Sequence, residues 1–569
     1  MCVVADPPSP IAPPAPIRPP SPPMPPSPPI PPQAPSRAFA TCTSDDAAMV
    51  RVPARHDDDP AYKKRGVRLP TAWFPAAPAP TTGNQVVSYT YGVCAFNDMA
   101  EALLTAFAPE HRIYIAGWGT NKDVVLKAGT TTTLEGYLSS TRAQVRGMFY
   151  DGVIGVSPWL STKAPVENKW VTDAINAHPS GGAVLDGKLP PIGFHHQKLL
   201  VVQGQFGLVA FVGGMDIDPS RISVDPGAGR PMHDTHLRIA GNAALACRRI
   251  FEDRWLDHPA THQLDQKLGA SATATTQERR ALAFPAPAAF DPSGLPSCTY
   301  LPGSKRENRP LRVAVGRTFA NLTKAGRTPY GFAPNGEYTA WSLIERGIQQ
   351  AVRWIYLEDQ YLISRMARAA LLDKFKDPAF EFLLMVMNGS AAAAVDVNFL
   401  VTARNELRRD LAKIDPGRTR WGMYTLKDLG DPERQKWCGT YLHSKTWIFD
   451  DGYTIIGSAN CDNRGYTHDA ELMVGVADAD AITVHLGEGF AADLRTRLWH
   501  KHLGLPHAQV RDFEKGLRHW RKPPPTAMIQ DASALEIDTH LSPPAQFPSA
   551  AEAPNYEFAW TKFVDPDSR

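Results

Sequence analysis

His443-Ser444-Lys445-Thr446-Trp447-Ile448-Phe449 and His196-Gln197-Lys198-Leu199-Leu200-Val201-Val202 are two related stretches that lie far apart in the chain. In each, a histidine and a lysine two residues apart open an apolar run. A turn then leads into a second apolar run, which ends in Gly457-Ser458 or in Gly213-Gly214. Successive side chains of a strand point to opposite faces, so each histidine emerges on the same face as its lysine. The pattern predicts two equivalent β-hairpins.

The similarity continues upstream of both hairpins. Ile113-Tyr114-Ile115-Ala116-Gly117-Trp118 and Ile355-Tyr356-Leu357-Glu358-Asp359-Gln360 are typical of strands, and a helical pattern precedes each of them. Before the first strand, Asn97-Asp98 together with Glu101 predicts a capped helix start. Helices that alternate with apolar strands predict an α/β fold. We expect two α/β sandwich lobes, related by a pseudo-twofold axis, with the functional site between them.

Composition restricts the class of protein. The chain has 569 residues, 43% of them hydrophobic, which is enough for a sizeable core. Its 60 Lys and Arg against 58 Asp and Glu leave a net charge of +2, so dedicated nucleic-acid binding is disfavoured. Seven scattered cysteines without a C-x-x-C pair indicate neither a disulfide scaffold nor a zinc ribbon. No apolar run is long enough to predict a transmembrane segment.

Four regions follow from these patterns. Residues 1–84 form a proline-rich, disordered arm and lead-in, residues 85–290 and 291–505 form the two lobes, and residues 506–569 form a surface tail. Met1 to Ser36 contains 17 prolines and should adopt an extended polyproline-II conformation. A spacer is the favoured interpretation, with docking to a protein partner or a role in export as the alternative. No signal peptide is recognisable. We therefore expect cytoplasmic synthesis, and leave open export as an effector or peripheral attachment to membranes.

The two His-Lys pairs indicate phosphodiester chemistry if they converge on one cleft. Two ammonium groups suit a tetrahedral phosphate, and an imidazole can act as nucleophile or proton donor near neutral pH. The sequence has no Walker, dinucleotide-binding or H-E-x-x-H pattern. We therefore expect no cofactor and no catalytic metal.

These residues resemble the phospholipase D superfamily, whose double H-x-K-x4-D signature is matched in full by His443, Lys445 and Asp450. The resemblance covers most of residues 90–505. It implies a metal-independent, two-step displacement at phosphorus through a phosphohistidine. By this analogy His196 is the nucleophile and His443 is the acid that protonates the leaving alcohol, although the symmetry of the site permits the opposite order. Lys198 and Lys445 would stabilise the phosphate oxygens.

A third repeated segment offers carboxylates that could orient the imidazoles. We align His233-Asp234-Thr235-His236 with His468-Asp469-Ala470-Glu471. Asp234 would then orient the histidine of the first half, and either Asp469 or Glu471 that of the second half. Because Asp469 and Glu471 lie two residues apart on a presumed strand, the sequence does not choose between them.

Other residues near the hairpin ends complete the predicted site. Ser458 and Asn460 are expected to bind substrate, and Asn460 would add a neutral hydrogen-bond donor. Asp216 stands at the place that matches Asn460, where its carboxylate must pair with a lysine or turn away from phosphate. His195 should point away from the site into the core, and His236 is expected to be structural.

The first hairpin departs from the signature. After Lys198 and four further residues stands Gln203, where the second copy has Asp450. Asp450 is followed by Asp451-Gly452, a strong hairpin-turn signal, so its expected role is structural. We therefore expect Gln203 to leave the chemistry intact, and a disabled first half is the alternative.

Two further features have alternative interpretations. The stretch from Asp151 to Pro191, with Trp159 and Trp170, is either a lid or membrane-contact loop, or an ordinary surface excursion. Trp421 and Trp437 either hold lipid at the interface or belong to the core.

The resemblance leads to one functional expectation with alternatives. We expect a phospholipase D that acts at a membrane surface. It would hydrolyse phosphatidylcholine or phosphatidylethanolamine to phosphatidic acid and free head group, and could also exchange the head group by transphosphatidylation. Same-fold alternatives are a phosphodiester nuclease and a phosphatidyl transferase of the cardiolipin synthase type. A catalytically impaired lipid-binding scaffold is the alternative from another class.

Overall fold

The computed structural model describes residues 70–152, 163–222, 232–291, 311–388, 398–427, 440–479, 489–533, 566, 567 and 569. All of them belong to one compact unit. The proline-rich arm lies outside the described residues. Among the helices described, none is sufficiently long and apolar to cross a membrane.

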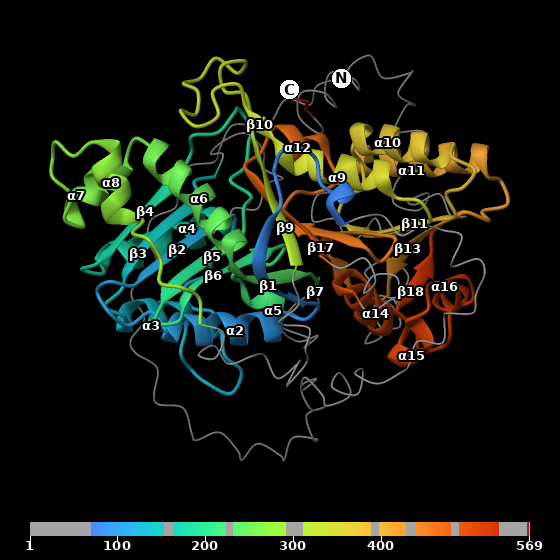
Figure 1. Ribbon diagram of the computed structural model, residues 1–569, viewed down its shortest axis with the longest axis horizontal. Coiled ribbons are helices and arrows are strands. Elements are labelled where there is room, and N and C mark those ends of the chain that lie inside the picture. Colours follow the sequence, from blue (N-terminus) through green and yellow to red (C-terminus); the bar gives the residue numbers. More distant parts are fainter. Residues whose placement is uncertain are drawn as a thin grey trace, which may run out of the picture. The chain divides into compact units, whose positions relative to one another are not determined.

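A sixteen-stranded sheet runs through both lobes (Figure 1). Its first-lobe strands are β1 (Thr81–Tyr89), β2 (Arg112–Gly117), β3 (Gln144–Tyr150), β4 (Gly181–Asp186), β5 (Leu199–Gly204), β6 (Gly207–Gly213) and β8 (His236–Gly241). Its second-lobe strands are β9 (Leu311–Phe319), β10 (Glu337–Tyr338), β11 (Trp354–Asp359), β12 (Phe382–Met387), β13 (Trp421–Leu426), β15 (Lys445–Phe449), β16 (Tyr453–Gly457), β17 (Glu471–Asp478) and β18 (Ile529–Asp531).

The strand order confirms the repeat. The first lobe runs β1-β8-β6-β5-β2-β3-β4, and the second runs β9-β17-β16-β15-β11-β12-β13, with β18 added at its edge. In both lobes the last three strands of this order are mutually parallel. Strands β1 and β9 pair in antiparallel fashion where the lobes meet, as a pseudo-twofold axis between them requires. The two predicted hairpins are β5–β6 and β15–β16.

Helices cover the sheet and bury it on both sides. The first lobe has α2 (Gly92–Leu104), α3 (Leu134–Ser140), α4 (Lys163–Ala177), α5 (Pro219–Ile222), α6 (Asn242–Asp257), α7 (Thr261–Lys267) and α8 (Thr276–Ala283). The second has α9 (Thr339–Gln350), α10 (Arg365–Phe375), α11 (Asn398–Ile414), α12 (Asn463–Thr467), α14 (Phe490–Leu503), α15 (His507–Val510) and α16 (Phe513–Arg521). Strands buried on both faces appear in sequence as continuous apolar runs, such as Leu199 to Val202.

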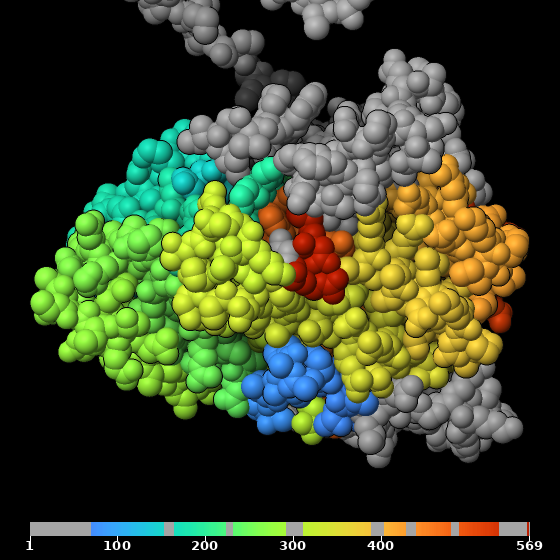
Figure 2. Space-filling view, turned by 90° about the horizontal axis from the view of Figure 1, so that it is seen from above, coloured from blue at the N-terminus to red at the C-terminus, as the bar shows by residue number. Residues whose placement is uncertain are grey.

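The folded region extends beyond both predicted boundaries. A short 3-10 helix, η2 (Pro70–Trp73), precedes β1, and Trp73 stacks on Tyr453 in the second-lobe core. In Figure 2 the blue residues of this segment lie against yellow second-lobe residues. At the other end, α16 buries Trp520, and β18 pairs with β13. The predicted lead-in and surface tail are therefore wrong for residues 70–84 and 507–531, because these residues fill parts of the second-lobe core and sheet.

The last described residues also lie against the folded region. The Pro566 carbonyl accepts a hydrogen bond from Thr467 Oγ1 at 3.3 Å, and the Arg569 carbonyl accepts one from Lys324. In Figure 2 these terminal residues, in red, lie between segments coloured yellow-green and yellow.

The predicted helix cap is wrong. Helix α2 begins at Gly92, so Asp98 lies in its interior rather than at its start. The Asp98 carboxylate turns toward the sheet, where it accepts hydrogen bonds from Tyr89 Oη at 2.5 Å and from Arg238 Nη1 at 3.2 Å. A buried tertiary contact thus replaces the expected local one.

The stretch from Asp151 to Pro191 contains ordinary elements of the lobe. Its described part holds α4, which packs on β3 and β4, and the strand β4 itself. Trp170 is 52% exposed on α4, whereas Trp159 lies outside the described residues. Trp421 is buried in β13 and belongs to the core, and Trp437 is also outside the described residues.

Candidate active site

Each signature histidine immediately precedes a hairpin and is held by the opposite lobe. The backbone N–H of His196 donates to the carbonyl of Ala470 at 2.9 Å, and that of His443 donates to the carbonyl of His233 at 2.7 Å. Around the second contact, β7 (Met232–His233) and β14 (Tyr441–Leu442) form a small parallel sheet. The pseudo-twofold relation therefore extends to the site itself.

The imidazoles are oriented by carboxylates that cross between the lobes. His196 Nδ1 lies 2.8 Å from Glu471 Oε1, and His443 Nδ1 lies 2.8 Å from Asp234 Oδ2. The predicted pairing within each half is wrong. Asp469, the other candidate, accepts hydrogen bonds from the Phe194 N–H at 2.9 Å and from Arg464 at 3.1 Å.

The sheet register explains this correction. Gly213 pairs with His236 between β6 and β8, and the equivalent Gly457 pairs with Met473 between β16 and β17. Met473 is therefore the counterpart of His236, and Glu471, two residues earlier, is the counterpart of Asp234. The shared His-Asp dipeptides had suggested an alignment that is displaced by two residues.

The two lysines are buried beside the histidines. Lys198 Nζ donates to the His196 carbonyl at 3.0 Å and lies 3.3 Å from Asp216 Oδ1. Lys445 Nζ donates to the His443 carbonyl and to Gln360 Oε1 at 3.0 Å. Burial lowers the pKa of both lysines, that of Lys445 to about 8.

The charges of each His-Lys pair act on the histidine of the other pair. Burial lowers the pKa of His196 well below its usual value, and the charges of Lys198 and Lys445 lower it further. Burial likewise lowers the pKa of His443, followed by the charges of Arg221 and both lysines. The pKa of each imidazole is therefore lowered by cationic side chains of both lobes. A neutral imidazole whose Nδ1 is held by a carboxylate can present the Nε2 lone pair to an electrophile.

Burial also acts on the orienting carboxyls. It raises the pKa of Asp234 to about 6 and that of Glu471 to about 7, against the opposing effect of the nearby lysines. Ser458 supports the second of these groups, because its hydroxyl donates to Glu471. Its carbonyl also lies 3.1 Å from His196 Nδ1. Ser458 is therefore part of the orienting network.

The first lobe contributes an arginine that sequence reasoning missed. Arg221 Nη2 lies 3.0 Å from Asp216 Oδ2 and 3.4 Å from His443 Nε2. Burial alone would raise the pKa of Asp216, but the charges of Lys198 and Arg221 hold it below its usual value. Asp216 is thus ionised and paired. Asn460 is buried, and its Oδ1 has no partner in the part of the chain that the structure describes.

The fifth position after each lysine lies at the far end of the hairpin strand. Asp450 has a φ of +51° at the turn, and its carboxylate accepts the backbone N–H groups of Val352, Arg353 and Trp354 at 2.7, 2.9 and 2.8 Å. It thereby ties the turn to the start of β11. Gln203 instead accepts a hydrogen bond from Arg248 at 2.9 Å.

The two further histidines near the site, His195 and His236, are both buried. His195 Nδ1 lies 2.7 Å from Asp186, which also binds Arg254. Burial lowers the pKa of His236 to about 3. His195 thus lies in the core, as expected, whereas His236 lines a small pocket together with Lys198 and Asp216.

The site has three defining features. Its two lobes are related by a pseudo-twofold axis, each histidine is paired with a carboxylate of the other lobe, and a lysine lies beside each histidine. The comparisons with known proteins support membership of the phospholipase D superfamily. Residues 425–517 match the family model described as Phospholipase D.

Similar proteins include several lipid enzymes. Cardiolipin synthase 2 of Staphylococcus epidermidis is 24% identical over 310 residues, which cover 53% of this chain and 47% of the relative. Phospholipase D alpha 4 of Arabidopsis thaliana is 21% identical over 523 residues, with coverages of 72% and 63%. The crystal structure of phosphatidylserine synthase from Haemophilus influenzae has the same fold, with a TM-score of 0.50, 14% identity, and coverages of 85% and 95%. The chain spans about half the length of the cardiolipin synthases that it matches.

Proposed function

We propose that this protein transfers the phosphatidyl group of a glycerophospholipid, either to water or to an alcohol. Transfer to water is the phospholipase D reaction, which converts phosphatidylcholine or phosphatidylethanolamine to phosphatidic acid and free head group. Transfer to an alcohol is the synthase reaction. The similar proteins include a phospholipase D and a cardiolipin synthase, which supports proposing both reactions. The observation that carries the proposal is the convergence of two imidazoles, each held at Nδ1 by a carboxylate of the other lobe.

In the first step His196 Nε2 attacks phosphorus. The bond from phosphorus to the head-group oxygen breaks, and His443 Nε2–H gives its proton to that oxygen. The imidazole of His196 is the more exposed of the two, which favours it as the nucleophile. The negative charge of the bound phosphodiester raises the pKa of His443 relative to the empty site, so that it can carry the proton.

In the second step His443 removes a proton from water or from an acceptor alcohol. The resulting oxygen attacks phosphorus, the phosphorus–nitrogen bond to His196 breaks, and the product is released. Lys198 and Lys445 stabilise the phosphate oxygens in both steps, and loss of one preorganised donor of this kind typically costs about 10²–10³ in rate. Asn460 adds a neutral donor. Neither step requires a metal.

The test uses phosphatidylcholine vesicles in water that contains ethanol. We expect both phosphatidic acid and phosphatidylethanol, and loss of both products in His196→Ala and His443→Ala. Vesicles of phosphatidylglycerol test the synthase reaction through formation of cardiolipin. Cleavage of DNA without lipid turnover would favour a nuclease, against which the net charge of +2 argues. Vesicle binding without turnover would favour a scaffold.

A further inference from the structure

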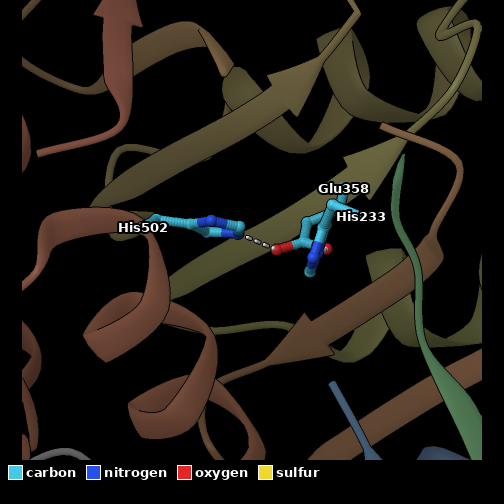
Figure 3. Close-up of side chains that lie close together, drawn as sticks. All are labelled: His233, Glu358 and His502. Atoms are coloured by element: carbon cyan, nitrogen blue, oxygen red, sulfur yellow. Dashed lines mark hydrogen bonds and ion pairs between the residues drawn. The ribbon is translucent and has the colours of Figure 1, made fainter. Parts of the chain in front are cut away.

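A buried polar cluster lies directly behind His443. Its centre is Glu358 on β11, and Figure 3 shows His233 beside Glu358 and the imidazole of His502 directed toward this carboxylate. His233 Nε2 lies 2.7 Å from Glu358 Oε2, and His502 Nε2 lies 2.7 Å from Oε1. His233 comes from the first lobe, whereas Glu358 and His502 come from the second. All three are at most 1% exposed.

Two histidines and a glutamate resemble a zinc-ligand set, but the hydrogen bonds of the cluster argue against a metal. Tyr356 Oη donates to Oε1 of Glu358 at 2.5 Å, and Ser444 Oγ donates to Oε2 at 2.6 Å. With the two imidazoles, four donors occupy the four lone-pair sites of the carboxylate.

The lysine beside the cluster fixes one of the protons. Lys501 Nζ lies 2.9 Å from His233 Nδ1, and an ammonium group can only donate. His233 Nδ1 must therefore accept, so the proton of this imidazole is on Nε2 and points at Glu358. The atom that a metal would need is already protonated and bonded.

Glu358 forms hydrogen bonds with both segments that carry the Asp234–His443 dyad, one through His233 and one through Ser444. His233 immediately precedes Asp234, the residue that orients His443, and its carbonyl accepts the His443 N–H. Ser444 immediately follows His443. The single oxygen Oε2 therefore ties the first-lobe segment to the second-lobe segment beside the point where Asp234 and His443 meet at 2.8 Å.

The first lobe has no equivalent behind His196. The strand registers make Ala116 the counterpart of Glu358, and Ala470 the counterpart of His233. Neither side chain can accept or donate a hydrogen bond. The Glu358 cluster therefore supports His443 and has no counterpart at His196.

We propose that Glu358 is a positioning residue that holds the Asp234–His443 dyad in register across the lobe interface. The proposal rests on the proposed function only in that His443 protonates the leaving group. The amide of Glu358→Gln replaces two acceptor sites with two donors, so two of the four hydrogen bonds must be reversed or lost. Around metal ligands, loss of a comparable supporting contact typically costs about 10–100-fold in activity, and we expect a loss of that order here.

The test compares two leaving groups in the full-length protein. Departure of choline from phosphatidylcholine needs a proton from His443, whereas p-nitrophenolate departs from the phosphatidyl p-nitrophenyl ester without one. The rate of leaving-group release is measured in the first turnover, because hydrolysis of the shared intermediate needs His443 with either substrate. We expect Glu358→Gln to slow the release of choline about 10–100-fold and the release of p-nitrophenolate much less. Equal losses on the two substrates, or no loss, would overturn the proposal.

Tyr356→Phe is the matched control. It removes one donor from the same carboxylate but leaves Oε2, with His233 and Ser444, intact. We expect it to lower stability without changing the ratio of the two rates. A selective loss as large as that of Glu358→Gln would contradict the proposal. If Glu358→Gln does not fold, Ser444→Ala should show the same selectivity with a smaller loss.

Two readouts do not depend on turnover. The proton between His443 Nδ1 and Asp234 should give a low-field proton NMR resonance, identified by its loss in His443→Asn, and Glu358→Gln should shift or broaden it. An unchanged resonance would overturn the proposal, even if the protein proved inactive on lipids. Zinc bound at one equivalent by the purified wild type and lost in Glu358→Gln would replace the positioning role with a metal site.

Discussion

Asp234→Asn and Glu471→Gln each disrupt one crossed dyad while changing a single heavy atom. In both dyads a carboxylate oxygen lies 2.8 Å from an imidazole Nδ1. An amide that offers its NH2 group to Nδ1 forces the ring proton onto Nε2, the atom that must attack phosphorus or accept a proton. An amide that offers its oxygen lacks the charge that stabilises an imidazolium. The corresponding change in a Ser-His-Asp triad costs about 10⁴ in kcat, so we expect losses of about 10³–10⁴ in each variant.

The assay is the formation of phosphatidic acid and phosphatidylethanol, expressed per mole of folded protein. Asp469→Asn is the control, because Asp469 resembles Asp234 in sequence but binds Arg464 and the Phe194 N–H. We expect its kcat to change little. The reasoning would be refuted if Asp469→Asn were as inactive as Glu471→Gln, or if either dyad variant kept most of its activity.

Three further predictions concern the lysine and the two signature positions. Gln203→Asp should leave kcat nearly unchanged, because Gln203 binds Arg248 at the far end of β5, and a gain of orders of magnitude in the lipid assay would show instead that the first half is impaired. Burial lowers the pKa of Lys445 to about 8, so its positive charge is lost as the pH rises through that value. We therefore expect kcat/KM to fall above about pH 8. A pH profile of kcat/KM that stays flat well above this pH would contradict the role of Lys445 in stabilising the phosphate. Asp450→Ala should lower the free energy of unfolding by about 3 kcal/mol, because three backbone N–H groups lose a charged acceptor, and an unchanged urea midpoint would exclude this structural role.

The sequence predicted the repeat well because its signals are local. An apolar run that follows His-x-Lys and ends in glycine can be recognised without tertiary information. Both predicted hairpins are present in the structure. The α/β class and the pseudo-twofold relation followed from the order of such elements.

The orienting residues were harder to predict because they depend on register. Asp469 and Glu471 are both plausible from spacing, and the His468-Asp469 dipeptide resembles His233-Asp234. Pairing of Gly457 with Met473 fixes β17, and that backbone register, not the likeness of side chains, brings Glu471 to His196. That the dyads cross between lobes could not be deduced from either half alone.

Other omissions have a similar cause. Arg221 reaches His443 from a four-residue helix with no sequence signal of its own. Trp520 lies in a nine-residue helix that is too short to give a clear apolar periodicity in the sequence, so its segment was predicted to be a tail. In the structure Trp520 is buried in the core.

The most direct test of the mechanism is to locate the covalent intermediate. The protein would be mixed with phosphatidylcholine, quenched rapidly with alkali, digested, and analysed by mass spectrometry for a phosphatidyl adduct. The account predicts the adduct on His196 in the wild type and none in His196→Ala. An adduct on His443 or on any other residue, or lipid turnover that survives the loss of both histidines, would contradict it.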